Sequence, residues 1–430
     1  MSRLSSLNKL SGCLFYAILL CPNFSYAEII TKDTLVNFNE EKNYISDVFD
    51  VENDATLNFD TTLDTTRFGD SQLIIDSGGG INIVNGTVHL SRNLKPLING
   101  TGYINVSGPN SILYSDGYWR LGKIGIDKKG GRLSITNGGT FQAPEIHENV
   151  DSLNVSGSNS QIITKRFLMG CDRSDSCNDL TVYVDDYGEI NATNEVGAGF
   201  AWQKSKTFLV ASNGGKVSTD TITISTNGNL VLGTKEGEPL QKAGTIEANK
   251  IEFVFDYDNK ADKKITLNHT STDAEINAAI RSKVSGLGTI DVLNGTTLLS
   301  GNNSDFSGKT NIYHNGVLKI KKNLGLSDIY NDGALYLIPE EDMQFDNMIS
   351  GSGYVVISNN VPDIHGMHST HIGGNNAAFS GEFTIEQLAS VIVNTPKNLG
   401  NATIANNGWL DIDTQSDWDF SNTMTGDGGL

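Results

Sequence analysis

The stretch Gly301-Asn-Asn-Ser-Asp-Phe-Ser-Gly308 returns further along the chain as Gly374-Asn-Asn-Ala-Ala-Phe-Ser-Gly381. Matching segments flank both copies: Val284-Ser-Gly-Leu-Gly288 with Ile349-Ser-Gly-Ser-Gly353, and Lys322-Asn-Leu-Gly325 with Lys397-Asn-Leu-Gly400. A third copy opens at Met424-Thr-Gly-Asp-Gly428. The chain therefore contains an internal repeat, and the interval between equivalent residues grows from the start of the repeat to its end.

Short segments of alternating apolar and polar residues fill the space between such boxes, for example Tyr103-Ile-Asn-Val106, Leu133-Ser-Ile-Thr136 and Thr221-Ile-Thr-Ile-Ser225. A period of two predicts strands with one buried and one wet face. Asn-Gly pairs separate the segments and begin at residues 85, 99, 137, 213, 227, 294, 315 and 407. Asn and Gly tolerate positive φ, so each pair predicts a sharp corner. Taken singly, each pair also fits a two-residue β-hairpin.

The repeat decides between these interpretations. Repeats built from short strands indicate a solenoid or a propeller, and a propeller needs four strands per blade at a steady period. The intervals here drift, which stacked coils absorb as loops of varying length. We therefore predict an all-β fold, a right-handed parallel β-helix with about 20 residues per coil. At a strand spacing of about 4.8 Å, some 20 coils would make a rod of about 90 Å.

Composition agrees with a large, secreted, all-β protein. The 430 residues include 46 Gly and 45 Asn, and only 19% are charged. This is too poor in Ala, Leu, Glu and Lys for a helical protein, while its Val, Ile and aromatic runs exclude disorder. The net charge of −19 excludes a nucleic-acid partner, because such binding needs clustered Lys and Arg.

Residues 1–27 predict a secretory signal peptide. Arg3 and Lys9 precede the apolar run Leu14-Phe-Tyr-Ala-Ile-Leu-Leu20, and Ser25-Tyr-Ala27 supplies the small residues of a cleavage site. The run is too short for a bilayer span of roughly 20 residues. Lipidation of Cys21 is the alternative, but Leu20 stands where a lipoprotein peptidase requires a small residue.

Two cysteines remain in the mature chain, Cys171 and Cys177. Thiols this close together in an exported protein predict one small-loop disulfide. A metal site is the weaker alternative, because two cysteines without a nearby histidine leave the coordination shell half empty.

The unit Leu298-Leu-Ser-Gly-Asn-Asn-Ser-Asp-Phe-Ser-Gly-Lys-Thr-Asn-Ile312, followed by Asn315-Gly-Val-Leu-Lys-Ile320, resembles the passenger-associated repeat of bacterial autotransporters. Val106-Ser-Gly-Pro-Asn-Ser111 and Leu133-Ser-Ile-Thr-Asn-Gly-Gly139 resemble units of autotransporter adhesins of the pertactin and diffuse-adherence type. Together these cover roughly residues 100–430. The resemblance implies a Gram-negative passenger that passes through the periplasm and then a C-terminal outer-membrane barrel, to stay at the cell surface or be secreted.

The resemblance also implies how the chain is divided into regions. We expect an N-terminal β-helix passenger region over 28–270 and passenger-associated repeats over 284–430, with the third copy truncated. Between them, Thr272-Asp-Ala-Glu-Ile-Asn-Ala-Ala-Ile-Arg281 predicts a short helical excursion over 271–283, which Thr or Asp can cap. The chain departs from the family because it shows no barrel and stops at Gly429-Leu430. We expect a fragment or a truncated gene product.

Candidate chemistry is sparse. Gly69-Asp-Ser71 is similar to the nucleophile segment of serine-protease passengers, but Gln72 replaces the following glycine, and a turn at a strand start is the favoured interpretation. Some β-helix lyases hold calcium on aspartates, for which Asp185-Asp186 and Asp256-Tyr-Asp258 with Asp262 are the best clusters. Adjacent carboxylates on a strand point to opposite faces, and the second cluster is typical of a wet loop. We interpret both as solvated surface and predict no catalytic residue and no cofactor.

His365-Gly-Met-His368-Ser-Thr-His371 falls in the insertion that lengthens the second copy between Gly353 and Gly374. Only a curled loop could gather His365, His368 and His371 onto zinc or copper, so a solvated loop is favoured over this weak metal candidate.

Two functions remain open. The first is a non-enzymatic adhesive and structural rod, which binds glycans or proteins of host or neighbouring cells through many weak contacts. The second is a polysaccharide-degrading enzyme of the lyase kind on the same scaffold. A eukaryotic secreted β-solenoid is a third interpretation, which the autotransporter-like repeat disfavours.

Overall fold

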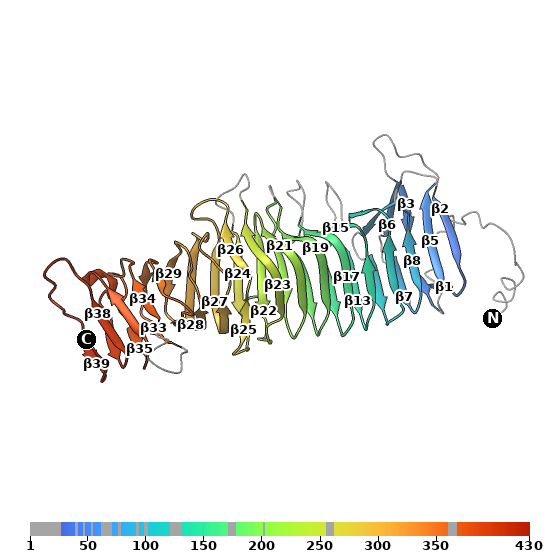
Figure 1. Ribbon diagram of the computed structural model, residues 1–430. Coiled ribbons are helices and arrows are strands. Elements are labelled where there is room, and N and C mark those ends of the chain that lie inside the picture. Colours follow the sequence, from blue (N-terminus) through green and yellow to red (C-terminus); the bar gives the residue numbers. More distant parts are fainter. Residues whose placement is uncertain are drawn as a thin grey trace, which may run out of the picture.

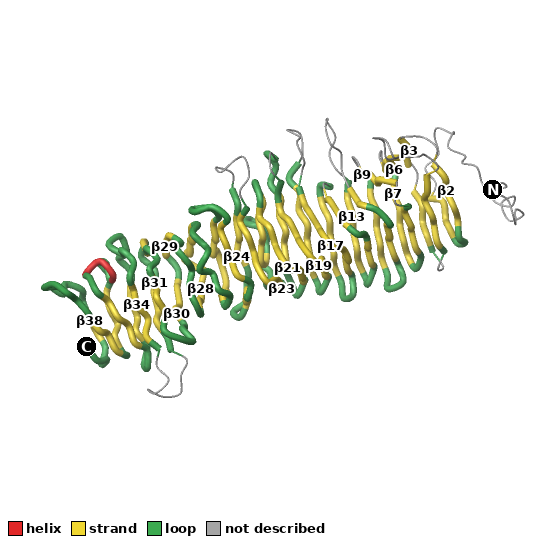
Figure 2. The backbone as a smooth tube through the Cα atoms, turned by 45° about the horizontal axis from the view of Figure 1, so that its top comes forward, coloured by secondary structure: helices red, strands yellow, loops and turns green. Residues whose placement is uncertain are grey.

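The computed structural model describes residues 27–38, 42–45, 48–52, 55–61, 71–75, 79–91, 94–98, 102–120, 131–148, 150–170, 178–200, 203–254, 262–359 and 368–430. These residues form an elongated rod of stacked turns, in which the chain advances from one end to the other (Figure 1). Strands make up the walls of the rod and loops connect them at its edges (Figure 2).

The strands stack in three sets. The first set consists of β1 (Ala27–Ile30), β4 (Val48–Val51), β7 (Gly80–Val84), β10 (Tyr103–Ser107), β13 (Arg132–Thr136), β16 (Ser152–Ser156), β18 (Leu180–Asp185), β20 (Thr207–Ala211), β22 (Gly228–Gly233), β24 (Lys264–Asn268), β27 (Thr289–Leu299), β28 (Lys309–Ile320), β29 (Asp328–Asn331) and β32 (Ile349–Ser350).

The second set consists of β2 (Thr34–Phe38), β5 (Thr56–Thr61), β8 (Thr87–Leu90), β11 (Ile112–Ser115), β14 (Thr140–Gln142), β17 (Gln161–Met169), β19 (Glu189–Ala198), β21 (Lys216–Ile224), β23 (Thr245–Phe253), β25 (Ala274–Ile276), β30 (Ala334–Leu337), β33 (Tyr354–Ile357), β35 (Glu382–Ile385), β37 (Thr403–Asn406) and β39 (Met424–Thr425). The long strands β27 and β28 bend into this set.

The third set consists of β3 (Lys42–Ile45), β6 (Ser71–Ile75), β9 (Leu94–Ile98), β12 (Tyr118–Arg120), β15 (Glu145–Glu148), β26 (Ala279–Ser282), β31 (Met343–Phe345), β34 (Ser369–Ile372), β36 (Ser390–Val393) and β38 (Trp409–Ile412). The strands β15 and β26 pair with the second halves of β17 and β23. The single helical element of the described ranges is the 3-10 turn η3 (Pro396–Asn398).

Every ladder between these strands is parallel, so the predicted parallel β-helix is confirmed. The hairpin interpretation is wrong for the Asn-Gly pairs that lie in the described ranges. Leu133, for example, lies between Ile104 of the preceding turn and Leu153 of the following one. Asn85, Asn137, Asn213 and Asn227 do adopt positive φ, between 46° and 56°, as their role at corners requires. The right-handed sense of the coil stays a prediction.

The number of residues per turn varies more than the estimate of about 20 residues per coil allows. The register Ala334↔Tyr354 closes a short turn, whereas Asn229↔Lys264 closes a much longer one. Loops of varying length are therefore present as predicted, but the expected length of about 20 residues per coil fits only the short turns, and the described part of the rod has fewer turns than predicted. Loops of different length leave each turn at its corners without disturbing the stacked strands.

The core consists of apolar ladders that run along the axis. One ladder joins Ile81, Ile104, Leu133, Leu153, Val182, Leu209, Leu230, Ile265 and Ile290, all at most 1% exposed. Its next member is Thr310, which is fully buried and whose hydroxyl contacts the Ser327 hydroxyl at 2.8 Å. A buried hydroxyl needs such a partner, because an unbonded one costs about 1–3 kcal/mol.

The repeat follows from this stacking. Phe306 and Phe379, the aromatic residues of the two boxes, are fully buried in the core. The glycines near the start of the second and third copies make equivalent hydrogen bonds. The backbone amide of Gly353 donates to the Asn331 carbonyl, and that of Gly428 donates to the Asn406 carbonyl, both at 2.9 Å. Equivalent residues thus make equivalent contacts between turns.

The predicted helical excursion over 271–283 is wrong. This segment forms β25 and β26, and Ile276 and Ile280 are both fully buried on the two sides of a corner. Ile276 and Ile280 are four positions apart because a corner lies between them. A buried face of an α-helix has the same spacing of apolar residues, so the sequence pattern alone does not distinguish the two structures. Within the described part of the chain, no helix has the length and apolar character to cross a membrane.

Candidate functional site

Most of the residues singled out as candidates lie outside the part of the chain that the structure describes. Cys171 and Cys177, His365, the pair Asp256 and Asp258, and residues 1–26 with Cys21 lie outside the described residues. Ser71 is the first residue of β6. The predicted disulfide and signal peptide stay predictions.

Asp185 and Asp186 lie at the end of β18, as a surface turn. Asp186 is exposed and has φ 47°, and the Asn213 side-chain amide donates to Asp185 at 3.2 Å. His371 lies in β34 and His368 just before it, both half-buried. Within the described residues no three His, Cys, Asp or Glu side chains gather as metal ligands. Because His365 is not among them, the structure does not test the favoured solvated loop against the weak metal candidate.

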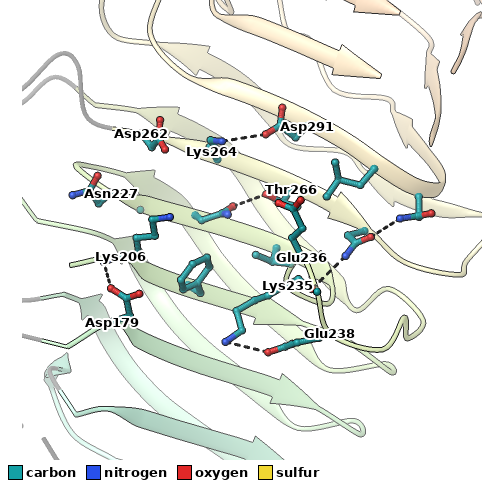
Figure 3. Close-up of a pocket in the computed structure, with 18 of the residues that line it drawn as sticks. Asp179, Lys206, Asn227, Lys235, Glu236, Glu238, Asp262, Lys264, Thr266 and Asp291 are labelled. Carbon is teal, nitrogen blue, oxygen red and sulfur yellow. Dashed lines mark hydrogen bonds and ion pairs between the residues drawn. The ribbon is translucent and has the colours of Figure 1, made fainter. Parts of the chain in front are cut away.

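A cleft of about 890 Å³ opens on the outer face of the first strand set, over β18, β20, β22, β24 and β27 (Figure 3). Its lining combines polar, charged and aromatic side chains: Asp179, Lys206, Phe208, Asn227, Gly228, Asn229, Val231, Lys235, Glu236, Gly237, Glu238, Leu240, Asp262, Lys264, Thr266, Asn268, Asp291, Leu293, Asn294 and Tyr313.

Two outward rows form the floor of the cleft. Parallel register aligns Phe208, Asn229 and Lys264 in one row, and Val231, Thr266 and Asp291 in the other. The two rows are cross-linked, because the Thr266 hydroxyl donates to the Asn229 side-chain oxygen at 3.0 Å. Neighbouring members of a row lie on successive strands, about 4.8 Å apart.

The loop between β22 and β23, residues 234–244, forms one wall. Thr234 and Asn268 are joined by two hydrogen bonds of 2.9 Å. The Thr234 backbone amide donates to the Asn268 backbone carbonyl, and the Asn268 side-chain amide donates to the Thr234 backbone carbonyl. Further along, the Thr270 backbone amide donates to the Gln241 carbonyl at 2.8 Å. The wall is thus held to β24 and the residues after it.

Lys235 connects this wall to aromatic residues of the strands beneath it. Its ammonium lies 3.1 Å from Glu238 and sits over the rings of Tyr183 and Phe208, at 5.3 and 5.4 Å from their centroids. The Tyr183 hydroxyl also donates to Glu238 at 3.0 Å. Burial lowers the pKa of Lys235, but its contacts with Tyr183 and Glu238 outweigh burial, so the pKa is raised overall.

Asp262, Lys264 and Asp291 form the opposite rim of the cleft, and the last two also belong to the floor rows (Figure 3). Tyr313, in β28, is a further lining residue. The Lys264 ammonium lies 3.4 Å from Asp291, whose other oxygen accepts a hydrogen bond from Asn311 at 2.7 Å. Burial lowers the pKa of Lys264, but the negative charges of Asp291 and Asp262 raise it by more than burial lowers it. The pKa of Lys264 is therefore raised overall. Burial, followed by the charge of Asp291, raises the pKa of the Tyr313 hydroxyl.

In this arrangement Lys264 and Tyr313 can donate hydrogen bonds but are poor bases. A lysine and a phenol whose pKa values lie above the ordinary ones both keep their protons near neutral pH, so neither is a ready base. The cleft instead presents donors, acceptors and aromatic faces in fixed positions. Of its members, only Asp262 stood among the candidate site residues of the sequence, whereas Asn227 and Asn294 were expected only as corners.

The fold and cleft define a parallel β-solenoid with a polar groove on its side. No protein-family model matches the chain. The uncharacterized protein YuaQ of Escherichia coli (strain K12) is 27% identical over 332 residues, which are 73% of this chain and 20% of that protein.

The uncharacterized lipoprotein YdeK of the same organism is 30% identical over 152 residues, which are 35% of this chain and 11% of that protein. The chain therefore spans a fifth or less of the length of these curated relatives. Among solved structures, the crystal structure of a TibC-catalyzed hyper-glycosylated TibA fragment is similar at 13% identity and a TM-score of 0.36, over 86% of this chain and 98% of that fragment.

Proposed function

We propose that this chain is part of an exported passenger of the autotransporter type, a non-enzymatic adhesive rod that binds glycans or proteins on host or neighbouring cells. The observation that carries the proposal is the stacked solenoid itself, whose outward rows present a succession of side chains along the axis. A surface of this kind favours many weak contacts that gain strength from avidity. The boxes at Gly301 and Gly374, which resemble passenger-associated repeats, and the similarity to the lipoprotein YdeK support export.

The rim of the cleft favours one alternative, a lyase-like enzyme. Asp262, Lys264 and Asp291 gather there, Tyr313 also lines the cleft, and β-elimination from a uronic-acid sugar needs a base near a carboxylate-binding group. Two features favour binding instead: Lys264 and Tyr313 hold their protons more tightly than usual, and Asp291 is already engaged by Lys264 and Asn311. We therefore place the enzyme second.

One experiment separates the two functions. The purified full chain, coupled to fluorescent beads, is incubated with epithelial cells and with Gram-negative cells, and beads carrying albumin serve as the control. We expect saturable attachment to at least one of the two cell types. In parallel, the free chain is incubated with pectate and alginate, with and without calcium, while unsaturated products are followed by ultraviolet absorbance. Calcium-dependent turnover without attachment would reject the adhesive rod in favour of the lyase.

The route of export is a separate test. Expression of the gene in a Gram-negative host, followed by mass spectrometry of the mature N-terminus, should show a chain that begins at Glu28. An acylated N-terminus at Cys21 would contradict signal cleavage after Ala27 and support a lipid anchor.

A further inference from the structure

We infer that the cleft over β20, β22 and β24 binds an uncharged oligosaccharide, held between the rings of Phe208 and Tyr313 and hydrogen-bonded by the side chains of its floor. The inference rests on the proposed adhesive function and names its site and ligand class.

Aromatic faces are the first argument. Phe208 is half-exposed on the floor and Tyr313, a further lining residue, is 42% exposed. The Lys235 ammonium lies over the Phe208 ring, 5.4 Å from its centroid, and the part of the ring that stays accessible lines the cleft. A flat apolar ring favours contact with an equally flat C–H face, which a pyranose ring supplies beside its hydroxyls.

The polar lining is the second argument. A sugar hydroxyl donates one hydrogen bond and accepts others, so it needs donors and acceptors side by side. Asn229 and Asn294 both carry side-chain amides into the cleft, and Lys264 adds a cationic donor. Asp291 accepts bonds from Lys264 and Asn311, but a carboxylate offers about four lone-pair sites, so it retains acceptors for a ligand.

Charge selects the kind of saccharide. Five carboxylates line the cleft, those of Asp179, Glu236, Glu238, Asp262 and Asp291, against the three ammonium groups of Lys206, Lys235 and Lys264. The whole chain carries a net charge of −19. An anionic polymer such as pectate, alginate or a sulfated glycan would meet repulsion both at a distance and in the cleft. An uncharged glycan meets none.

Rigidity is the third argument. The wall is fastened by Thr234 and Asn268 at one end and by Gln241 and Thr270 at the other. Asn294 extends this bonding to the next turn, since its amide donates to the Asn268 side-chain oxygen at 2.8 Å. A preformed site loses little freedom when a ligand binds, so even modest contacts give measurable affinity. The axial rows place a different polar group about every 4.8 Å, for example Asn229 and then Lys264, so successive sugar units would meet different partners.

The test uses the purified full chain on an array of neutral, sialylated, sulfated and uronic-acid glycans, followed by titration calorimetry with the best neutral binder. The variants are Phe208→Ala and Asp291→Asn in the cleft. Tyr336→Ala is the matched aromatic control, because Tyr336 lies on β30 under Lys319, away from the lining residues. Tyr313→Ala is added because its exposed ring can be removed with little risk to folding, and circular dichroism checks all variants.

We expect the wild-type chain and Tyr336→Ala to bind neutral glycans with equal affinity. Phe208→Ala, Asp291→Asn and Tyr313→Ala should each weaken binding about tenfold or more. The inference is overturned if no neutral glycan binds, if acidic glycans bind better, or if folded cleft variants bind like the wild type. Attachment of the coated beads to cells together with any of these results would leave the adhesive function standing and reject only this site.

Discussion

Asn303 and Asn376 occupy the same corner of two successive repeats, and both are fully buried. The side-chain oxygen of Asn303 accepts a hydrogen bond from the backbone amide of Ile280, at 2.9 Å, and that of Asn376 accepts one from Ile349, at 2.7 Å. Each asparagine thus satisfies a backbone donor of the preceding turn.

The same side chains also reach forward. The Asn303 amide donates to the Asn323 carbonyl at 3.3 Å, and the Asn376 amide donates to the Asn398 carbonyl at 2.7 Å. One side chain therefore connects three successive turns, with its oxygen and nitrogen used in opposite directions. This explains why the Gly-Asn-Asn box returns as a unit: its second asparagine is a connector within the core.

Replacing this connector should destabilise the C-terminal turns. In Asn376→Ala, the Ile349 amide and the Asn398 carbonyl lose a buried partner, which costs about 1–3 kcal/mol for each group left unsatisfied. Asn375→Ala is the control, because Asn375 is exposed and its side chain accepts only one bond, from Ala377 at 3.3 Å. Denaturant unfolding of both variants measures the difference, and equal stability would contradict the connecting role.

The apolar ladder makes a second prediction. Leu133→Ala should lower the free energy of unfolding by about 2–5 kcal/mol, because Leu133 is 1% exposed and stacks between Ile104 and Leu153. Ser134→Ala, the next residue on the wet face, should change it by less than about 0.5 kcal/mol. Hydrogen exchange should show the loss concentrated in the turns around β13, since a solenoid is stabilised by nearest-neighbour contacts. A loss spread evenly over the rod would argue against this one-dimensional behaviour.

These residues also show why the fold could be predicted. In Leu133-Ser-Ile-Thr136, the apolar residues are buried and the polar ones are half-exposed, as a period of two requires. Periodicity led to a wrong prediction at Ile276 and Ile280, where a helix was expected. The corner between two short strands places these two buried residues four positions apart, which is also the spacing of a buried helical face. Only pairing with Ile246 and Ile251 of the preceding turn distinguishes the two.

The cleft could not be predicted in the same way. Lys235, Lys264 and Asp291 share one cleft only because the turn that leads from β22 to β24 carries a long loop. Turn length depends on loops, which carry no periodic signal. The alternation in Lys264-Ile-Thr-Leu-Asn268 does show which side chains face outward, but it gives no information about which neighbours lie beside them.

Cys171 and Cys177 give a third prediction. Exported thiols at this spacing should form one disulfide. Peptide mapping without reductant should therefore recover both cysteines in one cross-linked peptide, two hydrogens lighter than the reduced form. The double variant C171S/C177S should lose at most about 3 kcal/mol, because the closed loop is short. Free thiols that react with a maleimide in the native exported chain would show that the bond does not form.

His269 gives the last prediction, a dependence of stability on pH. Its ring is buried, 1% exposed, and its Nε2 lies 2.8 Å from the Thr297 hydroxyl. Burial lowers the pKa of His269 below its ordinary value, and a hydrogen bond with the Ser271 backbone only partly opposes this. The folded chain therefore binds a proton at this site less readily than the unfolded chain does.

The sign follows from proton linkage. Above the ordinary pKa of about 6.5 the ring is neutral in both states, and its burial contributes in full to stability. Below that pH the unfolded chain takes up a proton that the folded chain resists, so the free energy of unfolding falls as the pH drops toward the lowered pKa. His269→Asn should flatten this part of the profile, whereas His314→Asn, a change at an exposed residue, should leave it intact. Denaturant titrations between about pH 5 and 8 measure both, and a slope that survives in His269→Asn would assign the effect to another group.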